Sequence, residues 1–321
     1  MGSEGCKTGL GDPSRVGGRS ASGSSDPCAH GGDLLRVEGL SIGFRMYDED
    51  SPSFFHARRR ERRVIDNLCL SVDRGEIVAV VGASGSGKTL LANAVLGSFE
   101  PNAVVSGDIW FEGRRMDARA LAAVRGNGIS LVPQSVAFLD PLMKVGRQVE
   151  GLVASGDADM RRARRKELFS RYRLDERVAD LYPFELSGGM ARRVLLCCAL
   201  IDEPRLIIAD EPTPGLDLPL ALKALGDFRS FADTGGGVVL ITHDIELALK
   251  AADRVAVFKD GTVVEEAPVG CFDDPECLAH PFSRALWHAL PSHDFAVLGE
   301  ARAAGSLWTA PAATGDAEGR R

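Results

Sequence analysis

Short, continuously apolar runs alternate along the chain with longer segments that have helical spacing of their apolar residues. The clearest runs are IVAVV, LIIAD and GVVLIT, at 77–81, 206–210 and 237–242. A helix-forming segment follows each of them. Strands buried on both faces read as continuous apolar runs, and intervening helices provide the crossovers between parallel strands. The pattern predicts an α/β fold with a mainly parallel sheet.

Other segments predict strands of a different kind. LLRVEGLSIGF (34–44) alternates in the manner of a strand, and LCLSVDRGEIVAVVG (68–82) is β-rich, with an Asp-Arg-Gly turn before its apolar run. VAVFKDGTVVEE (255–266) predicts a hairpin that turns at Asp260-Gly261. The mostly helical stretch at about 135–190 interrupts the alternation of strands and helices, and is expected to form an inserted helical subdomain.

Two segments have little capacity to build a core. Residues 1–33 are rich in Gly, Ser, Pro and Asp and predict a disordered tail, because they bury too little surface to offset ordering entropy. The segment 45–63 is acidic and then strongly basic. Its arginines, Arg58–Arg60, Arg62 and Arg63, predict a solvated surface loop, with a contact to anionic lipid or a partner as the alternative.

Composition narrows the class of protein. With 321 residues and 45% hydrophobic content the chain can bury a sizeable core, and a net charge of −7 argues against a nucleic-acid partner. No apolar run is long enough to span a membrane. Seven cysteines, an odd number without metal-type spacing, fit a reducing cytosol better than a disulfide framework.

A glycine-rich loop follows the apolar strand at 77–81. The sequence GASGSGKT (82–89) matches G-x-x-x-x-G-K-[ST] and precedes a helix, so backbone amides and the helix N-terminus can surround phosphate oxygens. Lys88 is expected to reach the β- and γ-phosphates, and the Thr89 hydroxyl to bind Mg²⁺. The candidate phosphate-binding residues are Gly82, Ala83, Ser84, Gly85, Ser86, Gly87, Lys88, Thr89 and Leu90.

A pair of acids follows the strand at 206–210. Asp210 fits the carboxylate that anchors Mg²⁺ in P-loop nucleotidases, and Glu211 fits a general base that polarises the attacking water. The loop and the acids together predict an NTPase.

Three further motifs follow the phosphate loop in a fixed order. LSGGM (186–190), ADEPTPGLD (209–217) and ITHD (241–244) together resemble the nucleotide-binding subunit of an ATP-binding-cassette (ABC) transporter. The resemblance covers about residues 34–290. It implies a P-loop NTPase core of the RecA-like type with an antiparallel β subdomain, an ABC ATPase domain at 34–268, and ATP and Mg²⁺ as cofactors.

The resemblance also implies roles for single residues. Gln134 matches the glutamine that touches Mg²⁺ and water where the transmembrane partner docks, and His243 matches the switch histidine that senses the γ-phosphate. Asp217 matches the D-loop aspartate. Ser187, Gly188 and Gly189 match the signature motif, which faces the nucleotide of the opposite subunit.

The family stacks an aromatic side chain on the adenine base shortly after the first strand. Phe44 occupies that place in LSIGF. Tyr47, Phe54 and Phe55 remain alternatives, because the segment 45–63 makes the register uncertain.

The C-terminal part of the chain resembles one branch of the family. LAHPFSRALWHALP (278–291) is similar to the C-terminal segment of oligopeptide, dipeptide and nickel importers, which implies an extension of that type at 269–321. Some peptide-type members continue into a cysteine cluster, and the chain has no cysteine after Cys277. This difference favours nickel or metallophore cargo over peptides.

Two departures from the family pattern bear on coupling. The residues after Gln134 read SVAF, where the family places an acidic or amide residue, which puts the permease contact in question. Pro214-Gly215 in the D-loop puts the coupling between the two nucleotide sites in question.

The branch implies a set of partners and a location. These are a second ABC ATPase subunit, identical or different, transmembrane permease subunits, and an extracytoplasmic substrate-binding protein acting indirectly. The location implied is peripheral, at the cytoplasmic face of the plasma (inner) membrane. The alternatives are an exporter ATPase, an ABC ATPase of DNA repair or translation, and a regulatory subunit that does not hydrolyse ATP.

Overall fold

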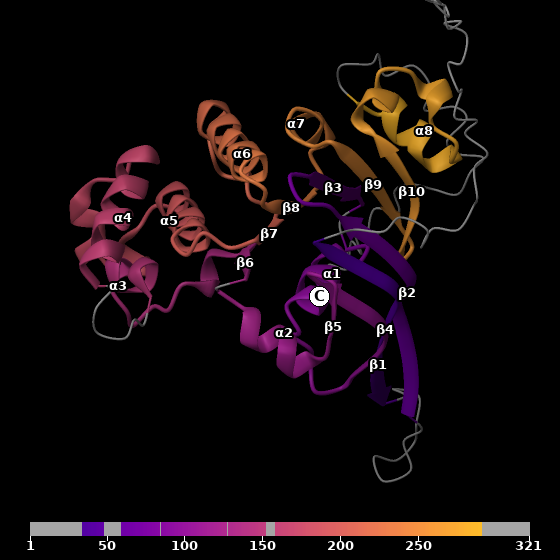
Figure 1. Ribbon diagram of the computed structural model, residues 1–321, viewed down its shortest axis with the longest axis horizontal. Coiled ribbons are helices and arrows are strands. Elements are labelled where there is room, and N and C mark those ends of the chain that lie inside the picture. The colour runs from indigo at the N-terminus through magenta and orange to yellow at the C-terminus, as the bar shows by residue number, and fades with distance from the viewer. Residues whose placement is uncertain (1–33, 48–58, 84, 127, 152–157, 291–321) are drawn as a thin grey trace, which may run out of the picture.

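The computed structural model describes residues 34–47, 59–83, 85–126, 128–151 and 158–290 (Figure 1). The predicted tail at 1–33 and the last part of the predicted C-terminal extension, 291–321, lie outside the described residues.

A four-stranded antiparallel sheet forms the first layer. Its strands, in the spatial order β2-β1-β4-β5, are β1 (Leu35–Tyr47), β2 (Arg59–Val72), β4 (Ala103–Phe111) and β5 (Arg114–Met116). The predicted antiparallel strands are therefore present.

The second sheet has six strands in the order β10-β9-β3-β8-β7-β6. Its strands are β3 (Ile77–Gly82), β6 (Ile129–Val132), β7 (Leu206–Asp210), β8 (Gly237–Thr242), β9 (Arg254–Lys259) and β10 (Thr262–Pro268). Only β10 is antiparallel to its neighbour, and Asp260 and Gly261 of the β9–β10 turn both have positive φ. The predicted parallel sheet and hairpin are confirmed.

Eight α-helices occur among the described residues. They are α1 (Lys88–Val95), α2 (Ala118–Val124), α3 (Val145–Glu150), α4 (Ala158–Arg171), α5 (Gly188–Leu200), α6 (Leu218–Asp233), α7 (Ile245–Leu249) and α8 (Pro281–His288). Helices α3, α4 and α5 contact one another and lie together to one side of the sheets (Figure 1).

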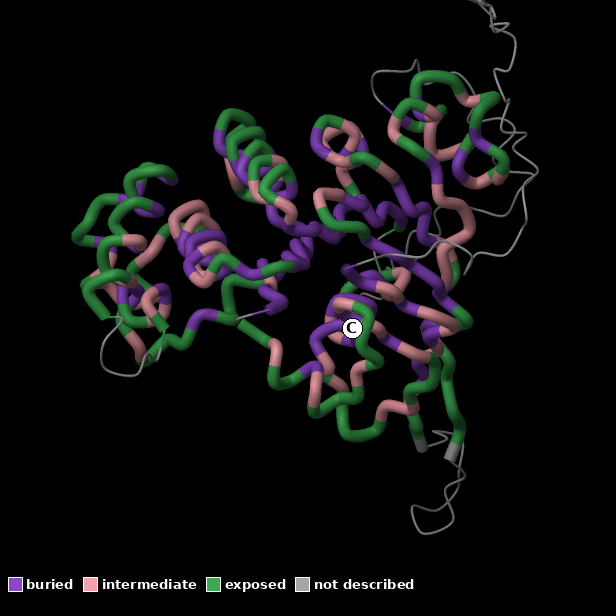
Figure 2. The backbone as a smooth tube through the Cα atoms, in the orientation of Figure 1, coloured by how far each residue is buried: buried purple, intermediate pink, exposed green. Residues whose placement is uncertain are grey.

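The parallel sheet divides the core in two, because its strands alternate their side chains between its faces. In β3, Ile77, Ala79 and Val81 pack with the α3–α8 helices, whereas Val78 and Val80 pack with α1 and the antiparallel sheet. The buried backbone accordingly follows the central strands (Figure 2). This two-sided burial explains the continuous apolar runs in the sequence.

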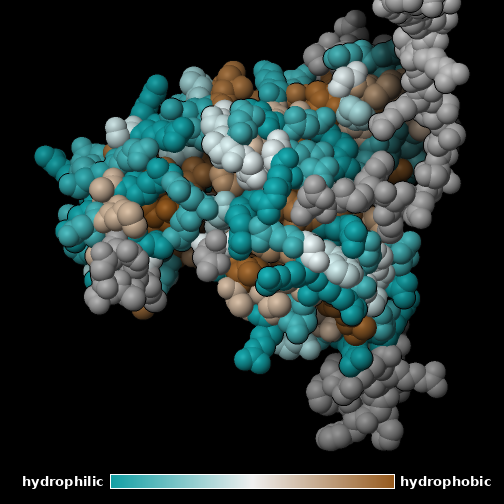
Figure 3. Space-filling view, viewed as in Figure 1, coloured by the Kyte–Doolittle hydropathy of each residue, from teal (hydrophilic) through white to brown (hydrophobic). Residues whose placement is uncertain are grey.

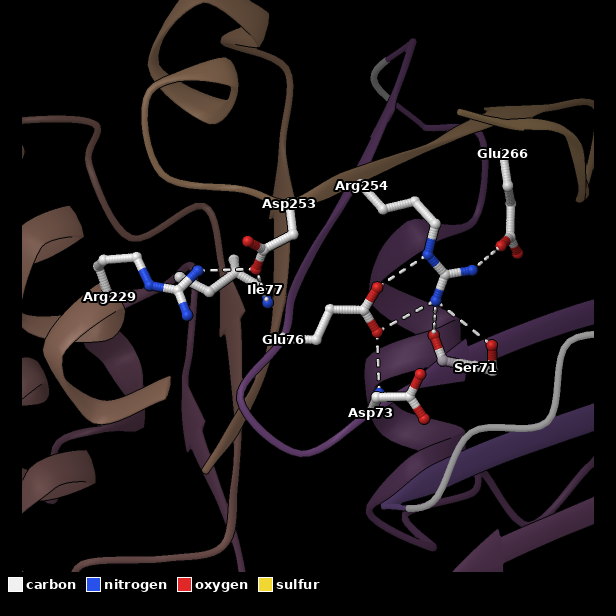
Figure 4. A network of polar contacts seen from close by, with 8 residues as sticks. All are labelled: Ser71, Asp73, Glu76, Ile77, Arg229, Asp253, Arg254 and Glu266. Carbon is white, nitrogen blue, oxygen red and sulfur yellow. Dashed lines mark hydrogen bonds and ion pairs between the residues drawn. The ribbon is translucent and has the colours of Figure 1, made fainter. Parts of the chain in front are cut away.

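A partly buried arginine joins the two sheets at one end of β3 (Figure 4). Arg254 on β9 donates to Glu76 Oε1 at 2.9 Å and to the Ser71 carbonyl on β2 at 2.7 Å, and it pairs with Glu266. Burial acts to lower the pKa of Arg254, but the hydrogen bond to Glu76 and the nearby carboxylates outweigh it and raise that pKa above its ordinary value. The cluster fixes the antiparallel layer against the sheet that positions the site.

The basic segment at 45–63 differs in part from the expected loop. β1 extends to Tyr47 and β2 begins at Arg59, with Phe44 opposite Arg62 across the ladder. Arg60, Arg62 and Arg63 are exposed, as expected, but they lie in a strand. The charges conceal a strand whose pairing comes from the backbone rather than from an apolar face.

The cysteines also differ from the expectation in one respect. Cys271 and Cys277 form a disulfide, because the 3-10 turns between them bring their Cα atoms to 5.1 Å. Cys197 and Cys198 on α5 are free thiols.

The molecular face in Figure 3 is mostly hydrophilic and has small hydrophobic patches. Within the described ranges, the helices are all too short or too polar to cross a membrane.

Candidate functional site

The phosphate loop leaves β3 and enters α1 at the carboxyl end of the parallel sheet. Gly87, the residue before α1, has a φ of 110° and no side-chain cap, so the first amides of the helix keep their hydrogens for an anion. Gly82 must be glycine here, because a Cβ would lie 2.2 Å from the Phe258 carbonyl oxygen. Ser84 lies outside the described residues.

Lys88 is folded back over this loop. Its Nζ donates to the carbonyls of Gly82 at 2.9 Å and Ala83 at 2.8 Å, and the residue is 7% exposed. Burial lowers the pKa of Lys88, while the charges of Glu211 and Asp210 oppose that shift. A buried ammonium held only by carbonyls is well placed to exchange them for phosphate oxygens.

A cavity of about 260 Å³ opens beside the lysine. It brings together residues far apart in the sequence: Val64, Gly85, Gly87, Lys88, Thr89, Leu90, Gln134, Asp210 and Glu211. Every one of these except Val64 was predicted as a site residue from the sequence. Val64 comes from β2, and no sequence motif marks it.

The two acids at the end of β7 differ in their surroundings. Asp210 is 3% exposed, and its Oδ1 is buried without a hydrogen-bond partner among the described residues. Burial raises the pKa of Asp210, and a hydrogen bond from Thr89 opposes that rise. Asp210 therefore lines the cavity and keeps one buried oxygen without a partner among the described residues.

Glu211 is held from three directions. Its backbone has a φ of 49°, which non-glycine residues seldom adopt, and its amide donates to the Ile241 carbonyl at 2.9 Å. Its Oε1 lies 2.8 Å from His243 Nδ1 and 3.1 Å from the His243 amide, and Thr242 Oγ1 lies 3.4 Å from Oε2. The predicted base and switch histidine are thus in direct contact.

Gln134 lies on the loop after β6 and is exposed at the cavity. Sequence analysis missed Arg192, whose Nη1 donates to the carbonyls of Pro133 at 3.2 Å and Glu211 at 3.5 Å and to that of Gln134. Burial lowers the pKa of Arg192, opposed by the charge of Glu211. This arginine ties α5 to the loop containing Gln134, but in sequence it is only one basic residue in a helix.

The predicted signature residues lie apart from this cavity. Ser187 caps α5, with its Oγ accepting from the Met190 amide at 3.3 Å. A Cβ on Gly188 would meet nothing within 4 Å, and one on Gly189 would lie 3.5 Å from the Gly215 carbonyl. Among the described residues, none of the three lines the cavity.

Asp217 has a local role in the same region. Its side chain caps α6 by accepting from the Leu220 amide at 2.9 Å. The predicted D-loop residue thus fixes the start of the helix that follows the two acids.

The adenine-stacking residue stays a prediction. Phe44 is partly buried and packs against the core of the antiparallel layer, and it is not among the described residues that line the cavity. Phe54, Phe55 and the side chain of Tyr47 lie outside the described part of the chain.

Comparison with known proteins identifies the kind of chain that has this geometry. A family model described as "ABC transporter" matches residues 65–214. The oligopeptide transport ATP-binding protein OppD of Lactococcus lactis is 34% identical over 272 residues, which are 81% of this chain and 76% of OppD. The dipeptide transport ATP-binding protein DppD of Escherichia coli is 32% identical over 270 residues, covering 80% and 78%.

A solved structure agrees with these relatives. The dimeric post-hydrolysis structure of the ATP-binding cassette MJ0796, bound to ADP and Pi, superimposes with a TM-score of 0.62 and 27% identity, over 74% of this chain and 99% of that one. These similarities show that the chain is an ATPase and that it belongs to the ATP-binding subunits of the ABC transporter family.

Proposed function

We propose that this chain hydrolyses ATP to drive the import of peptides through membrane-embedded permease subunits. The cavity that joins Lys88, Thr89, Gln134, Asp210 and Glu211 is the main support. The proposed cargo follows from the relatives, several of which are described as oligopeptide or dipeptide transport proteins. Nickel and metallophores remain the alternative cargo.

The residues at the cavity divide the chemistry between them. Lys88 and the first amides of α1 are positioned to bind the β- and γ-phosphates. Glu211 is positioned to accept the proton of the attacking water. His243 Nδ1 lies 2.8 Å from Glu211 Oε1, so we propose that this histidine orients the carboxylate toward the attacking water.

The residues present also fit Mg²⁺. Asp210 Oδ1 is a buried carboxylate oxygen without a partner among the described residues, and the Thr89 hydroxyl lies next to the same carboxylate. Hard oxygen ligands of this kind suit Mg²⁺, with the remaining positions taken by phosphate and water. When bound there, the ion would neutralise charge on the β- and γ-phosphates.

The second wall of each ATP site is proposed to come from another cassette subunit. The capped turn at Ser187 presents Gly188 to open space, and it lies apart from the cavity that the phosphate loop lines. Two subunits closing head to tail bring each turn to the ATP of the other. Two copies of this chain or a pair of different cassettes satisfy this geometry equally.

The permease is proposed to dock beside the loop after β6. A groove of about 310 Å³ lies between α5 and β6 and is lined in part by Leu131, Phe138 and Ala199. Phe138 is 67% exposed although it is aromatic. Docking there places this chain peripherally at the cytoplasmic face of the plasma membrane, and an extracytoplasmic binding protein would act through the permease.

Reconstitution tests the proposal. We expect proteoliposomes with the permease pair encoded beside this chain to hydrolyse ATP faster when a peptide-loaded binding protein is added. Stimulation by Ni²⁺-loaded or metallophore-loaded binding protein alone would replace the peptide assignment. ATP hydrolysis that neither the permease nor the binding protein alters would contradict the transport role.

A further inference from the structure

The end of α4 is joined to α6 by one buried aspartate. Tyr172, the residue after α4, donates its hydroxyl to Asp227 Oδ2 at 2.6 Å. Arg171 Nη2 lies 2.6 Å from the other oxygen, Asp227 Oδ1. Both oxygens of a carboxylate on α6 are therefore used by the helical layer.

The two contacts have different surroundings. Tyr172 is 1% exposed, and burial, followed by the charge of Asp227, raises the pKa of its hydroxyl, which therefore stays protonated and donates. The Arg171 side chain is 39% exposed and lines an open cavity of about 560 Å³. Solvent therefore screens the ion pair, while the hydrogen bond to Tyr172 is shielded from it.

The backbone of the same tyrosine is joined to α5. Arg193 Nη1 donates to the carbonyls of Tyr172 at 3.2 Å and Arg173 at 3.1 Å, and Arg193 Nε donates to the Gly189 carbonyl at 3.0 Å. Gly189 belongs to the turn that starts with Ser187. An unbroken set of contacts therefore leads from Asp227 on α6, through Tyr172 and Arg193, to the signature turn.

The N-terminal end of α6 follows closely in sequence on the two acids of the cavity, Asp210 and Glu211. Asp217 caps that helix directly after the loop that contains Asp210 and Glu211. A helix is stiff along its axis, so Asp227, ten residues further along α6, is fixed relative to the acids of the hydrolytic site.

We propose that Tyr172 and Asp227 are positioning residues, which hold the signature turn at a fixed place relative to α6 so that it can meet the ATP of the opposite subunit. The inference rests on the proposed function for the role of that turn. Neither residue touches the nucleotide cavity, so both act through α5 and α6.

The chemistry of the pair favours positioning over simple packing. Burying a carboxylate and a hydroxyl costs desolvation that two apolar side chains of similar size avoid. A hydrogen bond to one oxygen of a fixed carboxylate, by contrast, specifies the distance and direction between two helices. An apolar contact would let α4 slide along α6, which would move the turn that Arg193 ties to α4.

The test uses ATP-dependent dimerisation of the full chain with Glu211→Gln, which retains ATP. Adding Tyr172→Phe to it should raise the concentration of chain needed for half-maximal dimerisation roughly tenfold, the effect expected for losing one hydrogen bond to a buried charge. ATP affinity of the separate subunits should stay unchanged. Hydrogen exchange at residues 187–193 should become faster in Tyr172→Phe without nucleotide.

Two matched variants separate the hydrogen bond from other effects. Asp227→Asn keeps an oxygen acceptor for Tyr172 and loses the charge and the solvent-screened ion pair with Arg171, so it should dimerise like its parent. Ser230→Ala removes another hydroxyl on α6, one that donates only to Gly226 within that helix at 2.9 Å, and should change neither dimerisation nor exchange. If Tyr172→Phe folds poorly, Tyr172→Phe with Asp227→Leu removes the unpaired charge and should show the same loss.

The outcomes distinguish this inference from the proposed function. Parent-like dimerisation and parent-like exchange in Tyr172→Phe overturn the inference, as does an equal loss in Ser230→Ala. If the Glu211→Gln chain itself never dimerises with ATP, the head-to-tail closure of two copies of this chain fails instead. The exchange of residues 187–193 then decides the positioning role alone, and unchanged exchange in Tyr172→Phe overturns it.

Discussion

The phosphate loop and the signature turn both lead glycines into a helix, yet they are built differently. Gly85 and Gly87 of the loop have φ values of 77° and 110°, α1 lacks a side-chain cap, and Lys88 fills the centre. The signature turn has a serine cap on α5, and its Gly188 borders empty space. The first gathers its glycines and its cation within one chain, whereas a Cβ at Gly188 of the second would meet no other group of the described residues within 4 Å.

The difference shows where each half of the site obtains its order. The loop is held by the buried ammonium of Lys88, whose hydrogen bonds to the Gly82 and Ala83 carbonyls phosphate oxygens can replace. The signature turn is held by its own serine cap and by Arg193. Variants in the two places should therefore separate binding from closure.

Glu211→Gln tests the hydrolytic side with the largest expected effect. We expect ATP affinity to be retained and steady-state turnover to fall about 10³-fold, as for loss of a general base. The rate of phosphate release measures the turnover. The control is Glu276→Gln, at an exposed glutamate in a 3-10 turn. Near-normal turnover in Glu211→Gln would remove this residue from the role of base.

Lys88→Ala should break the anion site itself. We expect the affinity of the separate subunit for ATP to fall about 100-fold, because strong charge-assisted bonds to two phosphates are lost. Calorimetry gives the affinity, and Lys223→Ala on an exposed part of α6 should leave it unchanged. Equal affinities in all three chains would count against the phosphate-loop assignment.

Ser187→Arg, unlike Lys88→Ala, should reduce turnover without weakening ATP binding by the separate subunit. The bulky cation blocks the partner's ATP, so turnover should fall about 30-fold, a loss of roughly 2 kcal/mol at a desolvated contact. ATP affinity of the separate subunit should not change. Loss of that affinity would show that Ser187 belongs to the site of its own chain.

Replacing one glycine of the phosphate loop and one glycine of the signature turn compares the backbone conformations of these two segments directly. Gly87→Ala should lower the free energy of unfolding by about 1–2 kcal/mol, because alanine is strained at a φ of 110°. Gly188→Ala should change it by less than about 0.5 kcal/mol, since its Cβ meets nothing and alanine suits a helix. Denaturation of both variants measures the difference, and equal losses would mean that the signature turn is also strained.

Asp210→Asn should stabilise the nucleotide-free chain by about 1 kcal/mol while abolishing hydrolysis. Burial raises the pKa of Asp210 in the folded state, so above that pKa the ionised carboxylate disfavours folding. The advantage of asparagine should be full at neutral pH. It should shrink as the pH falls through the raised pKa and the wild-type carboxyl takes up a proton, which melting curves at several pH values can measure.

Most of the residues that line the cavity of the candidate site could be predicted because their motifs are local in sequence. Phosphate loops and acid pairs occupy strand ends, and continuous apolar runs mark those strands clearly. The contacts between distant segments could not be predicted in the same way. Arg192 and Tyr172 have partners 19 to 59 residues away, and nothing in their own neighbourhood marks them.

Two features of the structure could not be predicted from the sequence pattern, for opposite reasons. The arginines at 60, 62 and 63 conceal a strand, because both faces of that end of the ladder are exposed and no alternation develops. Asp227 is a polar residue in the buried stripe of α6, and only the partner explains why it is tolerated. The sequence pattern therefore predicts which residues are buried better than it predicts which distant residues they contact.

Because Lys88 and the signature turn lie apart in one chain, the effect of combining mutations in the two places depends on which subunit carries each mutation. Under head-to-tail closure of two copies, a Lys88→Ala subunit paired with a Ser187→Arg subunit places both lesions in one composite site and leaves the other wild-type throughout. If one subunit carries both changes and its partner neither, each site receives one lesion. Two alleles that are each inactive can therefore complement each other when the mutations lie in different subunits. The same two mutations in one subunit impair both sites of every mixed dimer.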